Sequence, residues 1–284
     1  MHLVFPTKWV YGGTTTQEMK EDEMSERDSY PAGVPCWVTN LQHDVPAARD
    51  FYGEMFGWEM ETGPADVAPY ALGRLRGRDV AAIGTMPDPD TPAAWVTEVR
   101  TDDLAATVAA VRDAGGEVLQ EEVDFSPVGR LGVFVDPLGA TFCAWEAGDR
   151  EGAQVVNEPS AWSMSALRTD DTERAVRFYG DVFGWEPEAF GPATMFRRPG
   201  YVGGEEAQPV PRDVVAVATP GEGGGPAVWG VDFWVDDVDR AVEDVRRLGG
   251  SVLAGPYDAP PSFRQAVVTD PRGAPFSLSQ LVAG

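Results

Sequence analysis

Apolar residues recur at spacings of three and four in four segments of the chain, which is the period of an amphipathic helix. An aspartate opens each segment and glycine ends it, as expected for a helix N-cap and a helix exit. Between these segments, apolar and polar residues alternate, which predicts half-buried strands. The four predicted helices lie within 44–57, 102–116, 169–184 and 236–250.

Two sequence patterns occur twice, in register. The segment DFYGEMFGWEME at 50–61 returns as RFYGDVFGWEPE at 177–188. The turn DPLGATF at 136–142 returns as DPRGAPF at 270–276. We therefore expect four similar units in two halves, residues 34–147 and 161–284, joined by a polar linker over 148–160. The polar, aperiodic residues 1–33 predict a disordered N-terminal arm.

Composition excludes several classes of function. The 284 residues carry a formal net charge of −24, which opposes contact with nucleic acid phosphates and with anionic membranes. No apolar run is long enough for a membrane helix. Cys36 and Cys143 form neither a disulfide framework nor a metal-binding pair. These features predict a cytoplasmic protein.

The repeated motifs resemble the vicinal oxygen chelate superfamily, which includes glyoxalase I, bleomycin-resistance proteins and extradiol dioxygenases. The resemblance covers residues 34–282 and implies an α+β fold. In this fold, four βαβββ modules form two cupped mixed sheets, with helices on the outer faces. Trp58 and Trp185, which follow the repeated helix, are then expected in the core. A ligand is expected on the inner face of each cup.

Catalytic members of the superfamily hold a metal ion on that inner face with His, Gln and Glu. The matching positions are Trp37, Val96 and Cys143 in the first half, and Met164, Gly230 and Ser277 in the second. These side chains are poor ligands for a hard metal ion. His2 lies in the arm and His43 beside a helix cap. The sequence therefore predicts no metal and no cofactor.

Alternation along the strands places further residues on the inner faces. Glu98 and Asp232 occupy equivalent repeat positions and are the candidate catalytic or recognition carboxylates. Arg130 and Arg264 also match, and we expect them to pair with acids on neighbouring strands. The predicted ligand-binding set is Trp37, Thr39, Val96, Glu98, Cys143, Trp145, Met164, Asp232, Trp234 and Ser277. Flat rings with one or two acids suit a planar, partly polar ligand.

Three functions remain open. The resemblance favours a metal-free binding protein for an aromatic natural product, such as a polyketide antibiotic of the anthracycline type, in biosynthesis or self-resistance. The alternative is a cofactor-independent enzyme, in which Glu98 or Asp232 moves a proton on an aromatic polyketide intermediate. The third is a protein without a ligand. The expected partners are a small aromatic molecule and a biosynthetic oxygenase, with the chain a monomer or a weak homodimer.

Overall fold

The computed structural model describes residues 26–63, 69–203, 211–221, 223–259 and 262–282. Within these residues the chain forms two eight-stranded sheets and four helices. The first sheet has the spatial order β2 (Glu59–Thr62), β3 (Tyr70–Leu75), β4 (Arg78–Thr85), β1 (Pro35–Gln42), β5 (Ala94–Thr101), β8 (Thr141–Ala147), β7 (Gly129–Val135), β6 (Glu117–Asp124). The second has the order β10 (Glu186–Phe190), β11 (Ala193–Arg197), β12 (Val214–Pro220), β9 (Trp162–Thr169), β13 (Val228–Trp234), β16 (Pro275–Leu281), β15 (Phe263–Thr269), β14 (Ser251–Ala259).

Both sheets are mixed and have the same construction. In the first, β1 pairs with β4 in parallel and with β5 in antiparallel, and β5 pairs with β8 in parallel. Strands β9, β12, β13 and β16 repeat these pairings in the second. Each sheet therefore consists of two βαβββ modules joined at their first strands. This confirms the predicted α+β fold.

The four helices begin at aspartate caps, as the sequence predicted. They are α1 (Val45–Phe56), α2 (Leu104–Asp113), α3 (Thr172–Phe183) and α4 (Val238–Arg247). Asp44, Asp103, Asp171 and Asp237 each accept a hydrogen bond at 2.9–3.1 Å from the backbone N–H three residues later. Such a cap satisfies one of the free N–H groups of the first turn. No helix among the described residues is long and apolar enough to cross a membrane.

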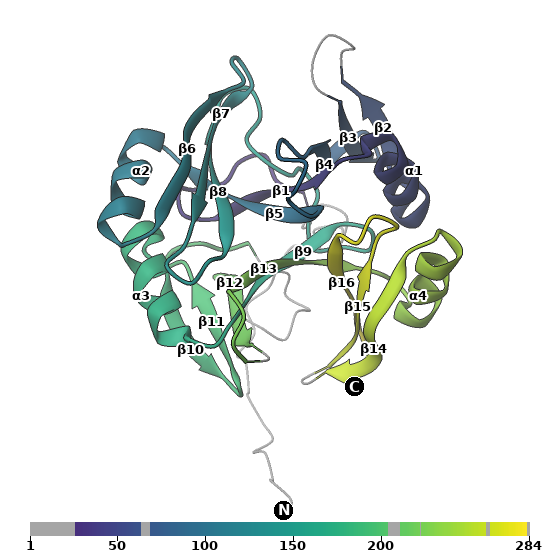
Figure 1. Cartoon of the computed structure of the whole chain (residues 1–284). Helices are drawn as coiled ribbons and strands as arrows, with labels where there is room; N and C mark the ends of the chain where they lie inside the picture. The colour runs from purple at the N-terminus through teal and green to yellow at the C-terminus, as the bar shows by residue number, and fades with distance from the viewer. Residues whose placement is uncertain (1–25, 64–68, 204–210, 222, 260–261, 283–284) are drawn as a thin grey trace, which may run out of the picture.

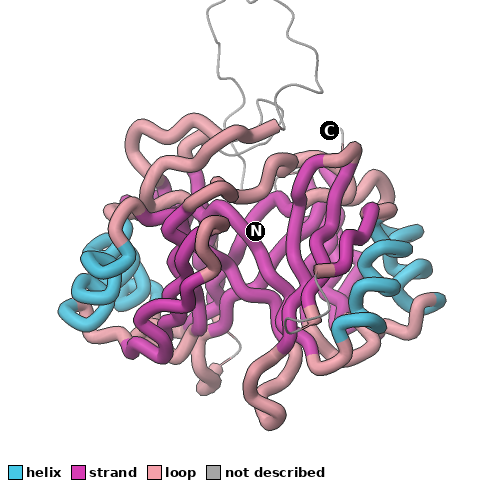
Figure 2. The backbone as a smooth tube through the Cα atoms, turned by 90° about the horizontal axis from the view of Figure 1, so that it is seen from above, coloured by secondary structure: helices cyan, strands magenta, loops and turns pink. Residues whose placement is uncertain are grey.

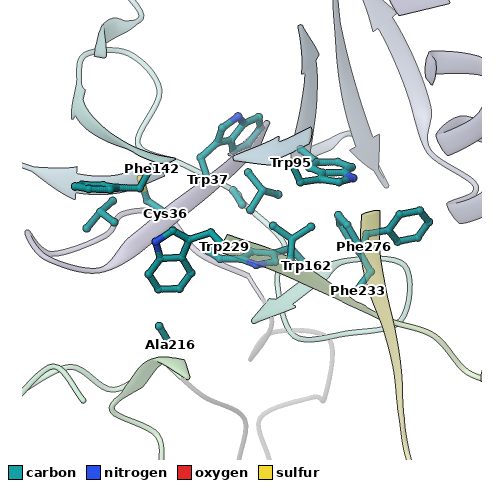
Figure 3. Packing of buried hydrophobic residues seen from close by; sticks show 14 of the residues in the cluster. Cys36, Trp37, Trp95, Phe142, Trp162, Ala216, Trp229, Phe233 and Phe276 are labelled. Carbon is teal, nitrogen blue, oxygen red and sulfur yellow. The ribbon is translucent and has the colours of Figure 1, made fainter. Parts of the chain in front are cut away.

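The two sheets pack against each other through the faces that carry the helices. Helices α1 and α4 lie together on one flank, and α2 and α3 on the other (Figures 1 and 2). In the centre, the ring of Trp95 on β5 lies 5.0 Å from that of Phe233 on β13 (Figure 3). Beside them, the Thr97 and Ser165 hydroxyls are 2.7 Å apart. The face of each sheet that turns away from this contact is called its inner face below.

The doubled motif connects the two halves. The Tyr52 hydroxyl of α1 donates to Asp270 in the turn of the second half at 3.1 Å, and accepts from the Trp95 indole at 3.0 Å. In the reverse direction, Tyr179 donates to Asp136 at 2.8 Å. Trp58 and Trp185 are buried behind these tyrosines, at 5% and 3% exposure. Their predicted place in the core is confirmed, and that core extends across both halves.

The predicted disordered arm is too long. Residues 1–25 lie outside the described residues, but residues 26–33 pack against the rest of the chain. Glu26 forms a β-bridge with Val155, and the buried Tyr30 donates its hydroxyl to the Ala153 carbonyl at 2.6 Å. The prediction failed for this segment because its polar composition hides one aromatic anchor.

Candidate functional site

Three strands bring the candidate residues into one row on each inner face. In the first half, Trp37 on β1 lies opposite Glu98 on β5, which lies opposite Cys143 on β8. The second half has the same row in Met164, Asp232 and Ser277. The register also places the two valine and glycine positions that match the family's metal ligands. Val96 lies opposite Thr39, and Gly230 opposite Ala166, so neither belongs to the central row.

The linker covers the first inner face. After β8, the chain turns back so that the Arg150 guanidinium carbon lies 5.2 Å from the centre of the Trp37 ring. The Trp145 indole N–H donates to the Arg150 carbonyl at 2.8 Å, which fixes this turn. The side chain of Arg150 also donates to the Tyr70 hydroxyl at 2.9 Å. The first inner face is therefore already occupied by the protein itself.

The exposure of the two inner faces differs accordingly. Six residues were predicted for the first face, and all but Thr39 are buried. The exposed fractions are 4–7% for Trp37, Val96, Glu98, Cys143 and Trp145. On the second face the predicted residues are partly exposed: Met164, Asp232, Trp234 and Ser277. Among the described residues, the side chains of the second face therefore keep more exposed surface than their counterparts on the first.

Substitutions between the repeats also open the second face. On the central strands, the second half has Met164 where the first has Trp37, and Gly230 where the first has Val96. The positions of Tyr70 and Trp145 are taken by Ala193 and Ser279. Each change removes side-chain volume, and the last also adds a hydroxyl. At these four positions the second face therefore carries smaller side chains than the first.

Asp232 is the polar centre of the second face. Its carboxylate accepts hydrogen bonds from the Ser279 and Ser163 hydroxyls, both at 2.7 Å. Gln265 donates to the Ser279 oxygen at 2.9 Å and so extends the network toward the outer strands. Burial raises the pKa of Asp232 to about 6, against the opposing effect of the two hydroxyl donors. Tyr257 of β14 is close enough for Asp232 to raise its phenol pKa further, although burial is the larger cause.

Glu98 is the matching group of the first face. Burial raises its pKa to about 7, while the Thr39 hydroxyl, which donates at 2.7 Å, and the Arg150 charge oppose the shift. Burial also raises the pKa of the Cys143 thiol well above its usual value, with a smaller contribution from Glu98. The thiol is therefore protonated near neutral pH and is a poor nucleophile and metal ligand.

The superfamily metal does not fit these rows. The first row offers an indole, a shielded carboxyl and a protonated thiol, and the second a thioether, a carboxylate and a hydroxyl. Within the described part of the chain, no group of three or more His, Cys, Asp or Glu side chains could hold a metal ion. His43 is exposed at the first helix, where its Nε2 lies 2.9 Å from the Thr91 carbonyl oxygen.

The repeat-matched arginines have the structural role that the sequence predicted. Arg130 forms ion pairs with Glu122 and Glu146 on the neighbouring strands β6 and β8. Arg264 pairs with Asp258 on β14 and with Asp239 on α4. Neither arginine is left for a ligand.

Sequence reasoning missed several groups around the carboxylates. Ser163 lies next to a bulge between β9 and β13, and this irregularity lets it reach Asp232. Tyr257 and Gln265 lie opposite each other on β14 and β15, in line with Ser279. Alternation from Ser277 and Ser279 could have identified Gln265, because the row continues across the sheet. Nothing in the sequence identified the position of Arg150.

Comparison with known proteins identifies the family. Residues 37–145 and 164–279 match the glyoxalase-like domain. CFP32 of Mycobacterium tuberculosis, named as a candidate glyoxylase, is 35% identical over 266 residues, covering 90% of this chain and 97% of its own. DnrV of Streptomyces peucetius, an anthracycline biosynthesis protein, is 33% identical over 273 residues, covering 90% of this chain and 96% of its own.

Solved structures agree on the fold. The Mn(II)-bound glyoxalase of Novosphingobium aromaticivorans superposes with a TM-score of 0.60 at 18% identity, over 89% of this chain and 83% of its own. An extradiol ring-cleaving dioxygenase from B. fuscum gives 0.59 at 17% identity, over 91% and 75%. Both halves of the chain therefore belong to the glyoxalase-like domain family and have the vicinal oxygen chelate fold.

Proposed function

We propose that the chain binds a small aromatic natural product of the anthracycline class, or an intermediate in its biosynthesis, on the inner face of the second sheet. The observation that carries this proposal is the contrast between the two faces. The matched face is covered by the chain's own linker, whereas Met164, Asp232 and Trp234 are partly exposed. Partly exposed apolar and aromatic side chains around one oriented carboxylate suit a planar ligand with a few polar groups.

Two relatives support the choice of ligand class. DnrV and the Streptomyces DauV protein, 32% identical over 270 residues, are both named as anthracycline biosynthesis proteins. A flat polycyclic ring can pack on Trp234 and Met164, while a hydroxyl or amine donates to Asp232. The hydroxyls of Ser163 and Ser279 already satisfy part of that carboxylate and fix its orientation.

Isothermal titration calorimetry with a panel of anthracyclines, their aglycones and simple anthraquinones tests the proposal. We expect saturable binding of at least one member with one ligand per chain, because the first face is occupied by Arg150. A stoichiometry of two would contradict the assignment to one face. Absence of binding by the whole panel at tens of micromolar would reject the ligand class.

The raised pKa values favour a second candidate function, proton transfer. A carboxylate with a pKa of about 6 can accept a proton and return it near neutral pH. The ligand would then exchange an acidic C–H or shift a double bond, without a cofactor. Incubation of a bound ligand in deuterated buffer, followed by mass spectrometry, measures this directly. Exchange that is lost in Asp232→Asn while binding persists supports catalysis, and no exchange above the buffer rate leaves binding as the function.

A further inference from the structure

Arg150 occupies the first inner face in the way a bound ligand would. Its guanidinium lies over the Trp37 ring at 5.2 Å, within the distance at which a cation is attracted to an aromatic face. One nitrogen donates to the Tyr70 hydroxyl at 2.9 Å, and another lies 3.7 Å from an Asp79 oxygen. Three different strands thus supply a ring, a hydroxyl and a carboxylate to one side chain, only 25% of which is exposed.

The backbone that presents Arg150 is itself fixed. Gly148 donates to the Val128 carbonyl at 3.0 Å and Asp149 to the Pro127 carbonyl at 2.9 Å. Together with the Trp145 indole, these bonds tie the linker to the rim of the sheet.

The carboxyl groups that interact with Arg150, those of Asp79 and Glu98, favour positive charge. Glu98 is 6% exposed and has one neutral donor, Thr39, at 2.7 Å. The charge of Arg150 stabilises its ionised form. A buried carboxyl, a second carboxylate and an aromatic face are the groups that proteins use to hold planar cations.

We propose that the first inner face is a binding site for planar organic cations, the alkylguanidinium and amidinium class, which the chain fills with its own Arg150. The site is formed by Trp37, Tyr70, Asp79 and Glu98. It is distinct from the aromatic site on the second sheet, and its test does not depend on that assignment. Removing the arginine side chain should therefore leave a site that a free guanidinium can enter.

Chemical rescue of Arg150→Ala provides the test. Ethylguanidinium reproduces the atoms that the substitution removes. At ten times its Kd, we expect it to raise the Tm of the variant by about 2–4 °C, since a ligand that binds only the folded state stabilises it by mass action. N-ethylurea, which has the same shape and no charge, should give no comparable rise. The wild-type chain should respond to neither compound at matched ionic strength.

Three further variants extend the test, and two of them, Arg150→Lys and Arg150→Met, do not depend on the folding of Arg150→Ala. If cation recognition holds the linker, Arg150→Lys should have a higher Tm than Arg150→Met, although methionine is the more apolar residue. In the double variant Arg150→Ala with Glu98→Gln, rescue by ethylguanidinium should be lost. Equal rescue by the urea, or a Tm for Arg150→Met at or above that of Arg150→Lys, would show that the arginine only fills space and would overturn the proposal.

Discussion

Two carboxylates at matched positions have different surroundings, and this difference assigns their roles. Glu98 is 6% exposed, receives one hydroxyl donor and interacts with the charge of Arg150, so it is shielded from a ligand outside the protein. Asp232 receives two hydroxyl donors but faces no cation among the described residues, and it is partly exposed. Such a group retains lone pairs for a donor from outside the protein. At the residue scale, Asp232 is therefore the carboxylate that the proposed function uses for recognition.

Substitution of Asp232 should change how stability depends on pH. Its pKa is about 6 in the folded protein against 3.8 in the unfolded chain. The stabilisation from the protonated group is therefore complete below pH 3.8 and is lost as the pH rises through about 6. Over two pKa units this loss is about 3 kcal/mol. Asp232→Asn cannot ionise, so its stability relative to wild type should improve by up to that amount between pH 4 and pH 8.

Urea unfolding of both proteins across this pH range measures the difference. Ser277→Ala, which alters the same face without removing a titratable group, is the matched control and should follow the wild-type curve. Parallel curves for wild type and Asp232→Asn would mean that the carboxylate is not shifted, and would remove the argument that it is a desolvated, functional group.

The element that organises the molecule is the repeated Asp-Pro-x-Gly-Ala turn together with the tyrosine of the opposite half. One oxygen of Asp136 accepts from the backbone N–H groups of Leu138 and Ala140 and so forms the turn. Its other oxygen accepts from Tyr179. Asp270 forms the same turn and accepts from both Tyr52 and Gln42. Each turn thus connects two strands of its own half and also binds a helix of the other half.

This arrangement predicts an asymmetry between two otherwise equivalent substitutions. Tyr179→Phe removes the side-chain donor that the structure gives to one oxygen of Asp136, whereas Tyr52→Phe leaves Asp270 the amide of Gln42. Leaving a buried acceptor unsatisfied costs about 1–3 kcal/mol. We expect Tyr179→Phe to lie at the upper end of that range and Tyr52→Phe at the lower end, measured by denaturant unfolding. Equal losses would contradict this account of the two turns.

Elements of this kind were predictable from the sequence, but their pairing across the halves was not. Periodicity, the aspartate caps and the doubled turn gave the four modules. The same signals cannot show how the two sheets pack against each other. The repeated tyrosine, Tyr52 and Tyr179, was therefore predicted only as a core residue and not as a hydrogen-bond donor to the other half. The sequence put both Val96 and Glu98 on the inner face, but it could not tell which of them lies opposite Trp37. Strands β1 and β5 run antiparallel, and their register pairs Trp37 with Glu98.

At the scale of the whole molecule, the described residues of the two halves leave their inner faces exposed to different degrees. The linker that joins the halves supplies Arg150 to the first sheet, where its guanidinium lies over Trp37. No sequence pattern predicts this, because it depends on the path of a polar loop rather than on any period. The halves keep the same strands and turns, while their inner residues diverge in size and polarity.

A pair of matched substitutions tests the central claim, that the second inner face is the ligand site. Gly230→Val introduces on the second face the side chain that the first face has at the matching position, Val96. An added Cβ at Gly230 lies 3.8 Å from the Ala166 carbonyl oxygen, so the fold should tolerate it. Val96→Gly makes the reverse change on the covered face. Calorimetric titration of the tightest-binding ligand should show at least a tenfold weaker Kd for Gly230→Val and an unchanged Kd for Val96→Gly. Unchanged binding by folded Gly230→Val, with weakened binding by Val96→Gly, would place the ligand on the first face and contradict the account.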